Sequence, residues 1–486
     1  MADRQRLGQA AGLEPDAARP LLDLQLEGIR EAPLGVGVCC DRRSAAAGVL
    51  GRATFPDADL WSCACAIENL WLAARAEGLG LGWVTLFDPP ELAGLLGLPD
   101  GVATLGWLCL GWPDERPPQP GLERAGWSRR LPVTQVVIDG RWPTGEGAPA
   151  APPSHLRAPD QNAVVAARDD TDRLLTPPGS LGVLDRVLDK VVALGNRELP
   201  AGTLVLVAAD HPVARHRVSA YPVEVTRQVL AAAAAGQAMG VCAAQTAGLA
   251  VELLDAGVSG APVEDVPALR CVDPRGDLVT ADAMSTRDTQ LLVQADQELG
   301  GRLAARGLVA LGEVGVANTT VAAALACALL DADPATVVGL GAGADTAMLD
   351  RKRAVVAAAL RRARAVHGTA WSDSLVVLAA VGGPEFAVLT GVVLGAAAVR
   401  AVVVLDGLAT CLAGLLAVRI EPAAAACLVA GQRSRERGHE AVLTQLGCEP
   451  LLDLRIRAGE GVGGCLASTI LRQGLATRAA TARVTY

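Results

Sequence analysis

Six apolar runs in the last two thirds of the chain each end in a glycine or an acid, and this repeat most constrains the fold. The runs span residues 203–210, 249–257, 307–313, 336–341, 374–383 and 401–407. Stretches of helical composition and crossover length separate most of them, which is typical of parallel strands joined by helices. The pattern predicts an α/β fold with a mainly parallel sheet, helices on both faces, and polar loops at the carboxyl ends of the strands.

The aromatic residues divide the chain into two parts. Seven of the eight tryptophans lie at or before Trp142, and residues 140–159 are rich in proline, glycine and alanine. Such a stretch favours extended, unpacked chain. We therefore predict an N-terminal part over 1–145, a linker over 146–160 and a C-terminal domain over 161–486. In the first part we expect strands at 34–40 and 81–86, helices at 62–77 and 90–96, and an apolar run at 105–110.

Composition excludes several classes of protein. The net charge of −9 and the pI near 5.2 argue against a nucleic-acid surface. The apolar stretch Phe386–Val399 has 14 residues, fewer than the roughly 18 that span a bilayer, so we expect a buried helix and a neighbouring strand. No signal core opens the sequence, and the twelve scattered cysteines show no zinc spacing. We expect a cytoplasmic protein with reduced cysteines, no metal and no membrane partner.

The segment Gly312–Thr320 (GEVGVANTT) carries the strongest functional signal. A glycine-rich turn that opens into a helix gathers free N–H groups at the positive helix end, where a phosphate binds well. The segment lacks the spacing and the lysine of a Walker loop. Glu313 stands directly before this turn, which indicates chemistry next to a phosphate rather than transfer of the phosphate.

Three further candidates stand out. Lys352 is one of only two lysines against 41 arginines, which indicates a need for a compact ammonium, although a solvated helix residue is the alternative. Glu460 lies between glycines and is a candidate general base, with a polar turn as the alternative. Asp210 and His211 close an apolar run, and for them we favour a structural or substrate-orienting role.

The run Val402–Thr410 is similar to the diphosphate site of ordinary phosphoribosyltransferases, but it has one acid, Asp406, where that site has two. A magnesium-bound diphosphate is therefore not supported.

Together these segments resemble the nicotinate-nucleotide:dimethylbenzimidazole phosphoribosyltransferase family over roughly residues 165–475. The matching motifs occur in the family's order, and each is weak alone. They are DRLLTPPGSLGVLD (173–185), AADH (208–211), VSAYPVEVT (218–226), GEVGVANTTVAAA (312–324), DRKRAV (350–355), VGGPEFAVLTG (381–391), VLDG (404–407) and LGCEPLLDLRIRAGEGVGGCLA (446–467).

The resemblance implies a three-layer domain, a small cap made of helices from both ends of that domain, and a homodimer. It also implies a reaction in which dimethylbenzimidazole displaces nicotinate from nicotinate mononucleotide to give α-ribazole 5′-phosphate, without a metal. By motif, Glu460 matches the general base, and Glu313 and Lys352 match its supporting acid and lysine. Substrate-binding residues implied in the same way are Gly315, Asn318, Thr319 and Thr320 for the phosphate, Gly461, and Ser180, Tyr221 and Gln228 for the aromatic base.

The chain departs from this family at several places. It has Pro212 where glycine is usual, Ala317 in place of the glycine of GNTT, and Gly431–Gln432 in place of Ser-His. Arg437 replaces a proline and Ala458 a leucine. None of these changes removes a proposed catalytic group, but they bear on substrate affinity and base specificity.

The first 145 residues resemble the later half of the nitroreductase-like, flavin-destroying dimethylbenzimidazole synthases. The match runs through residues 26–42, 66–89 and 105–115, with Thr85 where a catalytic hydroxyl residue is expected. The arginine-rich segment that grips the flavin phosphate has no counterpart before residue 20, so we expect no FMN. We expect a truncated, α+β part kept for packing, dimerisation or delivery of the base, or else a start placed too far downstream.

Three functions remain open at this stage. The leading one is the base-exchange transferase acting on nicotinate mononucleotide and dimethylbenzimidazole. The second is a bifunctional protein that also makes dimethylbenzimidazole from reduced FMN. The third is a binding protein that holds the nucleotide or the base without turnover, which the joint presence of Glu313, Lys352 and Glu460 disfavours.

Overall fold

The computed structural model describes residues 29–45, 48–113, 156, 161–177, 179–339, 341 and 345–484. The chain divides into two compact units, Met1–Gly121 and Leu122–Tyr486. Apart from Leu156, the predicted linker lies outside the described residues up to 160, so its bounds stay a prediction.

The first unit contains a three-stranded antiparallel sheet with the order β1-β3-β2. Its elements are β1 (Leu34–Asp41), α3 (Ala58–Ala76), β2 (Gly80–Val84), α4 (Pro89–Leu96) and β3 (Val102–Gly111). Ile67 and Ala74 of α3 pack on Leu81 and Leu108 of the sheet. The predicted strands and helices of this part are all present, and the apolar run at 105–110 is part of β3.

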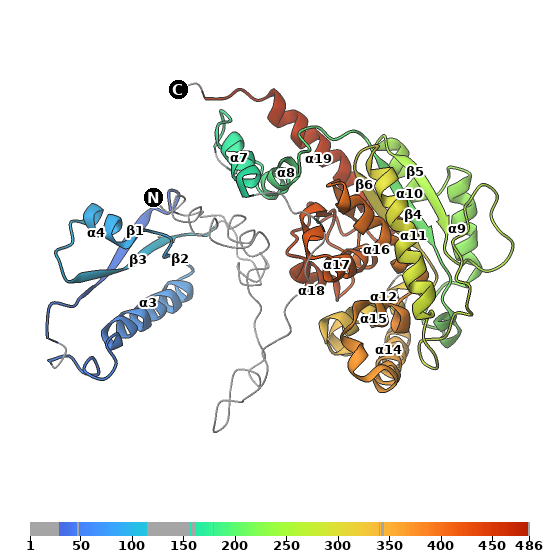
Figure 1. The fold of residues 1–486 in the computed structure, drawn as a ribbon, viewed down its shortest axis with the longest axis horizontal. Coiled ribbons are helices and arrows are strands. Elements are labelled where there is room, and N and C mark those ends of the chain that lie inside the picture. The colour runs from blue at the N-terminus through green and yellow to red at the C-terminus, as the bar shows by residue number, and fades with distance from the viewer. Residues whose placement is uncertain are drawn as a thin grey trace. The chain divides into compact units, whose positions relative to one another are not determined.

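The second unit is built on a five-stranded sheet of order β5-β4-β6-β7-β8, in which every pair is parallel (Figure 1). The strands are β4 (Thr203–Ala208), β5 (Ala250–Asp255), β6 (Val309–Val314), β7 (Val403–Leu405) and β8 (Leu428–Ala430). The helices between them are α9 (Glu224–Ala234), α10 (Met239–Thr246), α11 (Thr286–Ala304), α12 (Asn318–Leu330), α13 (Pro334–Val337), α14 (Thr346–His367), α15 (Ser374–Val381), α16 (Pro384–Ala398) and α17 (Leu408–Ile420). Short 3-10 helices occur at Pro212–His216, Gly368–Ser372 and Pro422–Cys427, and α18 (His439–Leu446) and α19 (Val462–Ala480) complete the unit.

Alternation along the strands places a hydrophobic layer on each face of the sheet. Val205 and Val207 of β4 point into the layer that α11, α16 and α17 cover. Leu204 points to the opposite face, toward α10 and α19, and Leu206 toward α9 and α10. This confirms the predicted α/β architecture with three layers.

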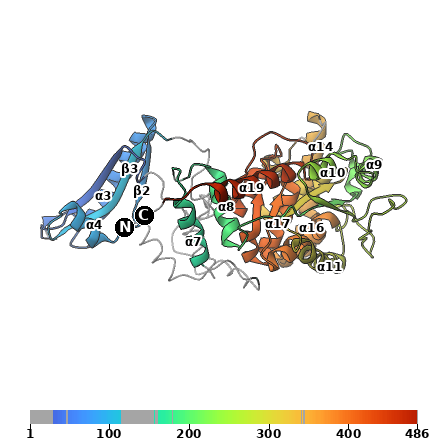
Figure 2. The ribbon, with the colours of Figure 1, turned by 90° about the horizontal axis from the view of Figure 1, so that it is seen from above.

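A small helical cap comes from both ends of this unit. The helices α7 (Gln161–Asp172) and α8 (Val183–Ala193) lie beside α19, as Figures 1 and 2 show. Buried Arg478 of α19 ties this helix to α8, because its guanidinium donates to Asp185 Oδ1 at 2.7 Å and to Asp189 Oδ1 at 2.8 Å. Thr171 Oγ1 of α7 donates to the same Asp189 Oδ1 at 2.8 Å. The cap expected from the resemblance is therefore present.

Two predicted strands are wrong. Residues 374–381 of the first run form the helix α15, and residues 336–337 of the second are the end of the short helix α13. Asp373 caps α15 by accepting a hydrogen bond from Leu375 N at 2.8 Å, and Val377–Val381 are all buried. A helix that is buried on every side shows no apolar period, so a run of this length reads like a buried strand. The strand expected within 386–399 is also absent, because that stretch continues α16 to Ala398.

The segment Glu224–Thr246 is long and apolar enough to cross a membrane by composition, with a mean hydropathy of 1.2. In the structure it is divided into α9 and α10, and both helices pack against β4 and β5. The segment therefore lies within the α/β domain.

The contact between α11 and α16 depends on glycine. A Cβ at Gly395 would lie 1.9 Å from Gln297 O, whereas a Cβ at Gly301 would lie 3.7 Å from Gly395 O. We expect Gly395→Ala to lower the free energy of unfolding by about 1–3 kcal/mol through overpacking. The matched change Gly301→Ala should leave stability equal or slightly higher, since alanine favours the helix. Thermal unfolding of both variants checks this, and equal melting temperatures would contradict it.

Candidate active site

The candidate site lies at the carboxyl edge of the parallel sheet. Glu313 is the next-to-last residue of β6, Asp406 follows β7, and Asp210 and His211 follow β4. Glu385 enters from the start of α16, and Glu460 stands just before α19. Five carboxyl groups from distant parts of the sequence therefore come to one edge, as the parallel topology predicts.

Glu460 has an unusual backbone that its surroundings hold in place. Gly459, Glu460 and Gly461 have φ angles of 68°, 58° and 79°, so a glutamate adopts the left-handed region between two glycines. Its N–H donates to Glu313 O at 3.3 Å, and its Oε2 accepts a hydrogen bond from Gly240 N at 2.9 Å. A non-glycine residue in this conformation costs about 1 kcal/mol or more and persists where neighbours fix it.

Glycines allow this close approach. A Cβ at Gly312 would lie 2.6 Å from Glu460 C, and a Cβ at Gly240 would lie 2.2 Å from Glu460 O. Real Cβ atoms do not come so near, so the turn that carries Glu460 packs directly on the backbone of β6 and α10. No local sequence pattern shows that these two positions require glycine, because the requirement arises only when the fold brings Glu460 against them.

The environment of Glu313 favours its neutral form. Burial raises the pKa of its carboxyl to about 8, and the charges of Glu385, Asp406 and Glu460 add to this shift. The side-chain amide of Asn318 donates to Glu313 Oε2 and opposes the shift. A carboxylic acid kept neutral in this way can donate a hydrogen bond.

The turn after β6 leads into α12 as the sequence predicts. Gly315, Val316 and Ala317 connect the strand to the helix, and Ala317 has a φ of 72°. A Cβ at Gly315 would lie 2.3 Å from Ala209 O, so the turn also requires glycine there. In the first turn of α12, Asn318 N and Thr320 N donate to Gly315 O and Ala317 O at 3.2 and 2.9 Å, so the helix offers an anion its positive end rather than these two N–H groups.

Lys352 of α14 reaches the same helix start. Its Nζ donates to Thr319 Oγ1 at 2.9 Å, and its side chain is only 3% exposed. Burial lowers the pKa of Lys352, and the charge of Glu436 opposes that shift. A positive end formed by Lys352 and the start of α12 thus stands beside the carboxyl groups.

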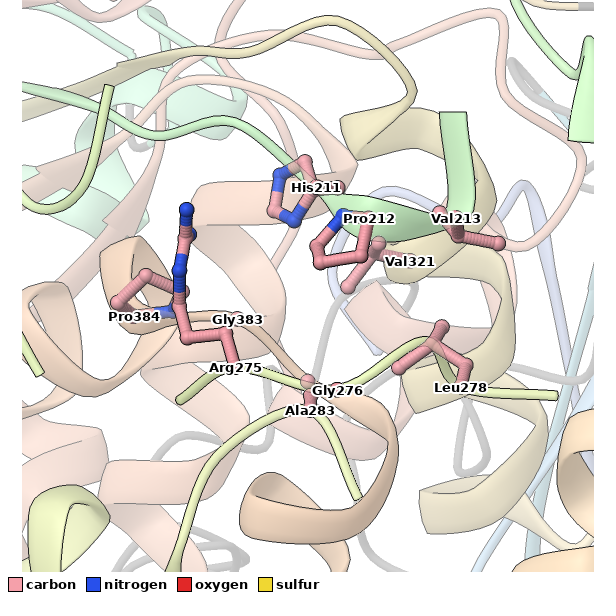
Figure 3. A pocket seen from close by; sticks show the side chains of 11 residues that line it. His211, Pro212, Val213, Arg275, Gly276, Leu278, Ala283, Val321, Gly383 and Pro384 are labelled. Carbon is pink, nitrogen blue, oxygen red and sulfur yellow. The ribbon is translucent and has the colours of Figure 1, made fainter. Parts of the chain in front are cut away.

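His211 and Glu385 form a buried pair that the sequence reasoning did not identify. His211 Nε2 lies 3.0 Å from Glu385 Oε1, and both side chains are buried. His211 also lines a cavity of about 10 Å³ with Arg275, Gly383 and Pro384 (Figure 3). That volume is about one water molecule, so this cavity is not the substrate site.

The residues predicted to bind the aromatic base lie on or near α8 and α9, and their role stays a prediction. Thr226 of α9 accepts a hydrogen bond from Val316 N at 3.0 Å, which ties α9 to the phosphate turn. Gln228 lies on the same helix, and Tyr221, half exposed, lies just before it. Ser180 lies near the start of α8, where its hydroxyl accepts from Thr176 Oγ1 at 3.0 Å. No hydrogen bond between Ser180 and the residues named at this edge is present in the described part of the chain.

Asp406, which the sequence analysis compared with a diphosphate site, is hydrogen-bonded to two residues of the protein. Its Oδ1 accepts from Gln432 Nε2 at 2.8 Å, and its Oδ2 accepts from Gly461 N at 3.2 Å. Burial raises the pKa of Asp406 to about 6, against those hydrogen bonds. Gln432 was also missed as a site residue, since only the fold places it beside Asp406. Over the described ranges, no group of three acidic, histidine or cysteine side chains is arranged to hold a metal ion.

The site has a positively charged side, formed by Lys352 and the start of α12, and an acidic side, formed by the carboxyl groups of the sheet edge. A phosphate fits at Lys352 and the start of α12, and a cationic centre one sugar away would lie among the carboxyl groups. This charge pattern suits a phosphorylated sugar that carries a cationic leaving group.

Comparison with known proteins agrees with this geometry. A family model described as "Phosphoribosyltransferase" matches residues 156–485, and one described as "Nitroreductase family" matches residues 5–112. The chain is similar to the nicotinate-nucleotide–dimethylbenzimidazole phosphoribosyltransferase of Chloroflexus aurantiacus, with 40% identity over 64% of this chain and 90% of the relative. The enzyme of that name from Mycobacterium tuberculosis is 37% identical over 68% of this chain and 92% of its own length.

A solved structure gives the same result. The nicotinate-nucleotide–dimethylbenzimidazole phosphoribosyltransferase from Thermus thermophilus matches with a TM-score of 0.61 and 37% identity, covering 67% of this chain and 97% of that one. The predicted fusion of a nitroreductase-like part to a phosphoribosyltransferase domain is thereby confirmed. The chain belongs to the family of nicotinate-nucleotide–dimethylbenzimidazole phosphoribosyltransferases.

Proposed function

We propose that this chain transfers the phosphoribosyl group of nicotinate mononucleotide to 5,6-dimethylbenzimidazole and releases nicotinate. The observation that carries the proposal is the hydrogen bond from Glu460 N to Glu313 O, 3.3 Å long. It puts the candidate base and its supporting acid side by side, at the strand end from which the phosphate turn starts.

In this proposal the phosphate of the nucleotide binds at the start of α12. Lys352 and Thr319, at the positive start of α12, hold it, with Gly315 giving the backbone room to approach. This anchor places the C1′ carbon of the ribose beside the carboxyl groups. Binding energy from the phosphate is thus used to orient the reacting carbon.

At C1′ the bond to the nicotinate nitrogen breaks and a bond to the dimethylbenzimidazole nitrogen forms. The pyridinium is already a good leaving group, and its electron pair returns to the ring nitrogen. Glu460 takes the proton from the other ring nitrogen of the acceptor, so that the product base is neutral. Glu313, whose pKa is raised to about 8, is available as a hydrogen-bond donor, and the other carboxyl groups of the edge, where ionised, favour the cationic character that develops at C1′.

The acceptor base is assigned to the segment that contains Tyr221 and Gln228. Tyr221 precedes α9 and Gln228 is exposed on it, and the same helix carries Thr226, whose hydroxyl accepts from Val316 N of the phosphate turn. Gly461 belongs to the turn that carries Glu460, and Ser180 is kept as a proposed base contact on the family resemblance alone.

We propose that the N-terminal unit binds no FMN. Arg42 and Arg52 both pair with Asp59, at 3.0 and 3.4 Å, and Arg43 pairs with Asp41. These arginines are therefore engaged and do not form a free clamp for the flavin phosphate. We assign no flavin-dependent step to this unit, and a purified protein that carries bound FMN would overturn that assignment and favour the bifunctional function.

We also propose a cytoplasmic homodimer. The face of α3 that points away from the sheet exposes Trp61 and Leu72, 54% and 61% accessible, and an apolar helix face of this kind is normally covered. Sedimentation of the full chain as a monomer at micromolar concentration would contradict the dimer.

The function is tested by the dependence of nicotinate release on the acceptor. Purified full-length chain is incubated with nicotinate mononucleotide, with and without dimethylbenzimidazole. We expect release only when the base is present, because the transfer needs the attacking nitrogen. Equal release without the base would indicate a hydrolase, and no release in either case, with the nucleotide still bound, would indicate a binding protein.

A further inference from the structure

Gln432 lies beside the site, at the end of the neighbouring strand. β7 and β8 are parallel, with Leu405 opposite Ala430, so Asp406 and Gln432 emerge at the same edge one strand apart. Both side chains are buried, at 4% and 3% exposure. The amide Nε2 of Gln432 donates to Asp406 Oδ1 at 2.8 Å, a bond strengthened by the charge of the carboxylate.

The other oxygen of Asp406 holds the start of α19. Asp406 Oδ2 accepts from Gly461 N at 3.2 Å. A Cβ at Gly463 would lie 2.5 Å from Gln432 Cδ and 2.6 Å from Asp406 Oδ1. Both side chains therefore pack directly on the first turn of α19, and only glycine permits this approach.

Glu460 immediately precedes this turn and depends on it. Its left-handed backbone, with φ of 58°, is fixed on one side by the bond from its own N–H to Glu313 O. On the other side the next N–H, that of Gly461, is bonded to Asp406. Moving the Asp406 carboxylate would release one of these two fixed points.

We propose that Gln432 is a positioning residue for the transfer reaction, acting through Asp406 to fix the turn of residues 459–461 and so the place of Glu460. The proposal rests on the proposed function of Glu460 as the base. Gln432 itself touches no reacting atom.

The electrostatics of Asp406 provide a measurable signature. Burial raises the pKa of Asp406 to about 6, while the hydrogen bonds from Gln432, Gly461, Gly464 and Gly463 lower it. Removing the Gln432 donor must therefore raise the pKa further. Because the turn is held by the carboxylate form, activity should then be lost at a higher pH on acidification.

Glu460, the proposed base, must be deprotonated and contributes to the acid limb of both proteins, so the test is the shift of the limb between them. Three other titratable groups face Asp406. Glu313 faces it from β6 and has a pKa of about 8. Cys411 of α17 and Cys465 of α19 have thiol pKa values raised by burial, so both thiols are neutral over the range in question. None of the three titrates near pH 6.

A change of Gln432 to histidine supplies a rescue variant. An amide donates at every pH, whereas an imidazole ordinarily titrates near 6.5. Gln432→His should therefore restore the donor at pH 8.

The test compares Gln432→Met, similar in volume and lacking the donor, with the native chain. We expect kcat to fall about 10-fold, KM for nicotinate mononucleotide to stay within about 2-fold, and the acid limb of the kcat profile to move up by about one pH unit. Gln432→His should recover more than half of the native kcat at pH 8. Gln290→Met, on the exposed surface of α11, is the matched control and should change none of these quantities.

An unchanged kcat and an unmoved acid limb in Gln432→Met would overturn the proposal. So would a lowered kcat without a shift of the limb, which would make Gln432 merely structural. If Gln432→Met does not fold, Gln432→Glu takes its place, since a second carboxyl beside Asp406 should move the limb in the same direction.

A measurement that does not depend on catalysis tests the positioning role of Gln432 separately from the proposed function. Hydrogen exchange of the amides of residues 461–464 should be at least about 10-fold faster in Gln432→Met than in the native chain. If the native chain forms no product, the proposed function fails while exchange still decides the positioning claim. Equal exchange in the two proteins would overturn the positioning claim alone.

Discussion

Replacing Glu460 with glutamine is expected to lower kcat by about 10²-fold or more, while nicotinate mononucleotide binds nearly as before. The amide cannot take the proton of the acceptor, but it preserves the size of the side chain. Its NH2 and carbonyl can exchange places, so the hydrogen bond from Gly240 N at 2.9 Å can still be accepted. Steady-state kinetics for turnover and calorimetry for nucleotide binding measure the two quantities.

An acceptor without a proton to lose isolates the role of Glu460. An N-methylated benzimidazole attacks C1′ and stays cationic, so it requires no base. With this acceptor the native chain and Glu460→Gln should react at similar rates. An equal loss with both acceptors would make Glu460 a positioning group, and no loss with either would remove it from the mechanism. Glu298→Gln, exposed on α11, serves as the matched control.

Replacing Lys352 with methionine is expected to raise KM for nicotinate mononucleotide by about 10²-fold, since losing one partner of a buried charge pair costs about 2–5 kcal/mol. The ammonium is 3% exposed and bonded to Thr319 at the start of α12. The change also leaves Glu436 without the charge that lowers its pKa, so some loss of stability should accompany it.

The chain provides its own control, because Lys190 is the only other lysine. Lys190→Met, on α8, should leave KM and kcat unchanged. Lys352→Arg should not restore binding, because a Cβ at Gly341 would already lie 2.6 Å from Lys352 Nζ and a guanidinium is larger. A native KM in Lys352→Met would contradict the assignment of the phosphate to this helix start.

Much of the α/β domain is predictable from its apolar runs. β4 and β7 are Val- and Leu-rich, fully buried and followed by an acid or a glycine, which is the pattern of a central parallel strand. α15 is also a short run rich in Val, Leu and Ala, and its burial hides the apolar period that would mark it as a helix. β8 has three residues, too few for any period to register.

The site is less predictable than the fold. The turn of residues 315–320 can be recognised from local sequence, because a strand, a glycine turn and a helix follow one another along the chain. Glu460 lies 147 positions after Glu313, and no local pattern brings them together; only the family resemblance paired them. The hydrogen bonds that join Asp406 to Gln432 and Gly461 are visible only once β7, β8 and α19 are placed side by side.

The central claim is that this edge of the sheet exchanges one base for another on a phosphoribosyl group. It is tested most directly by identifying both products after incubating the full chain with nicotinate mononucleotide and dimethylbenzimidazole in a buffer that contains a metal chelator. We predict nicotinate and α-ribazole 5′-phosphate in equal amounts, by nuclear magnetic resonance and mass spectrometry. Intact nucleotide, or nicotinate accompanied by ribose 5-phosphate in place of the α-riboside, would contradict the account.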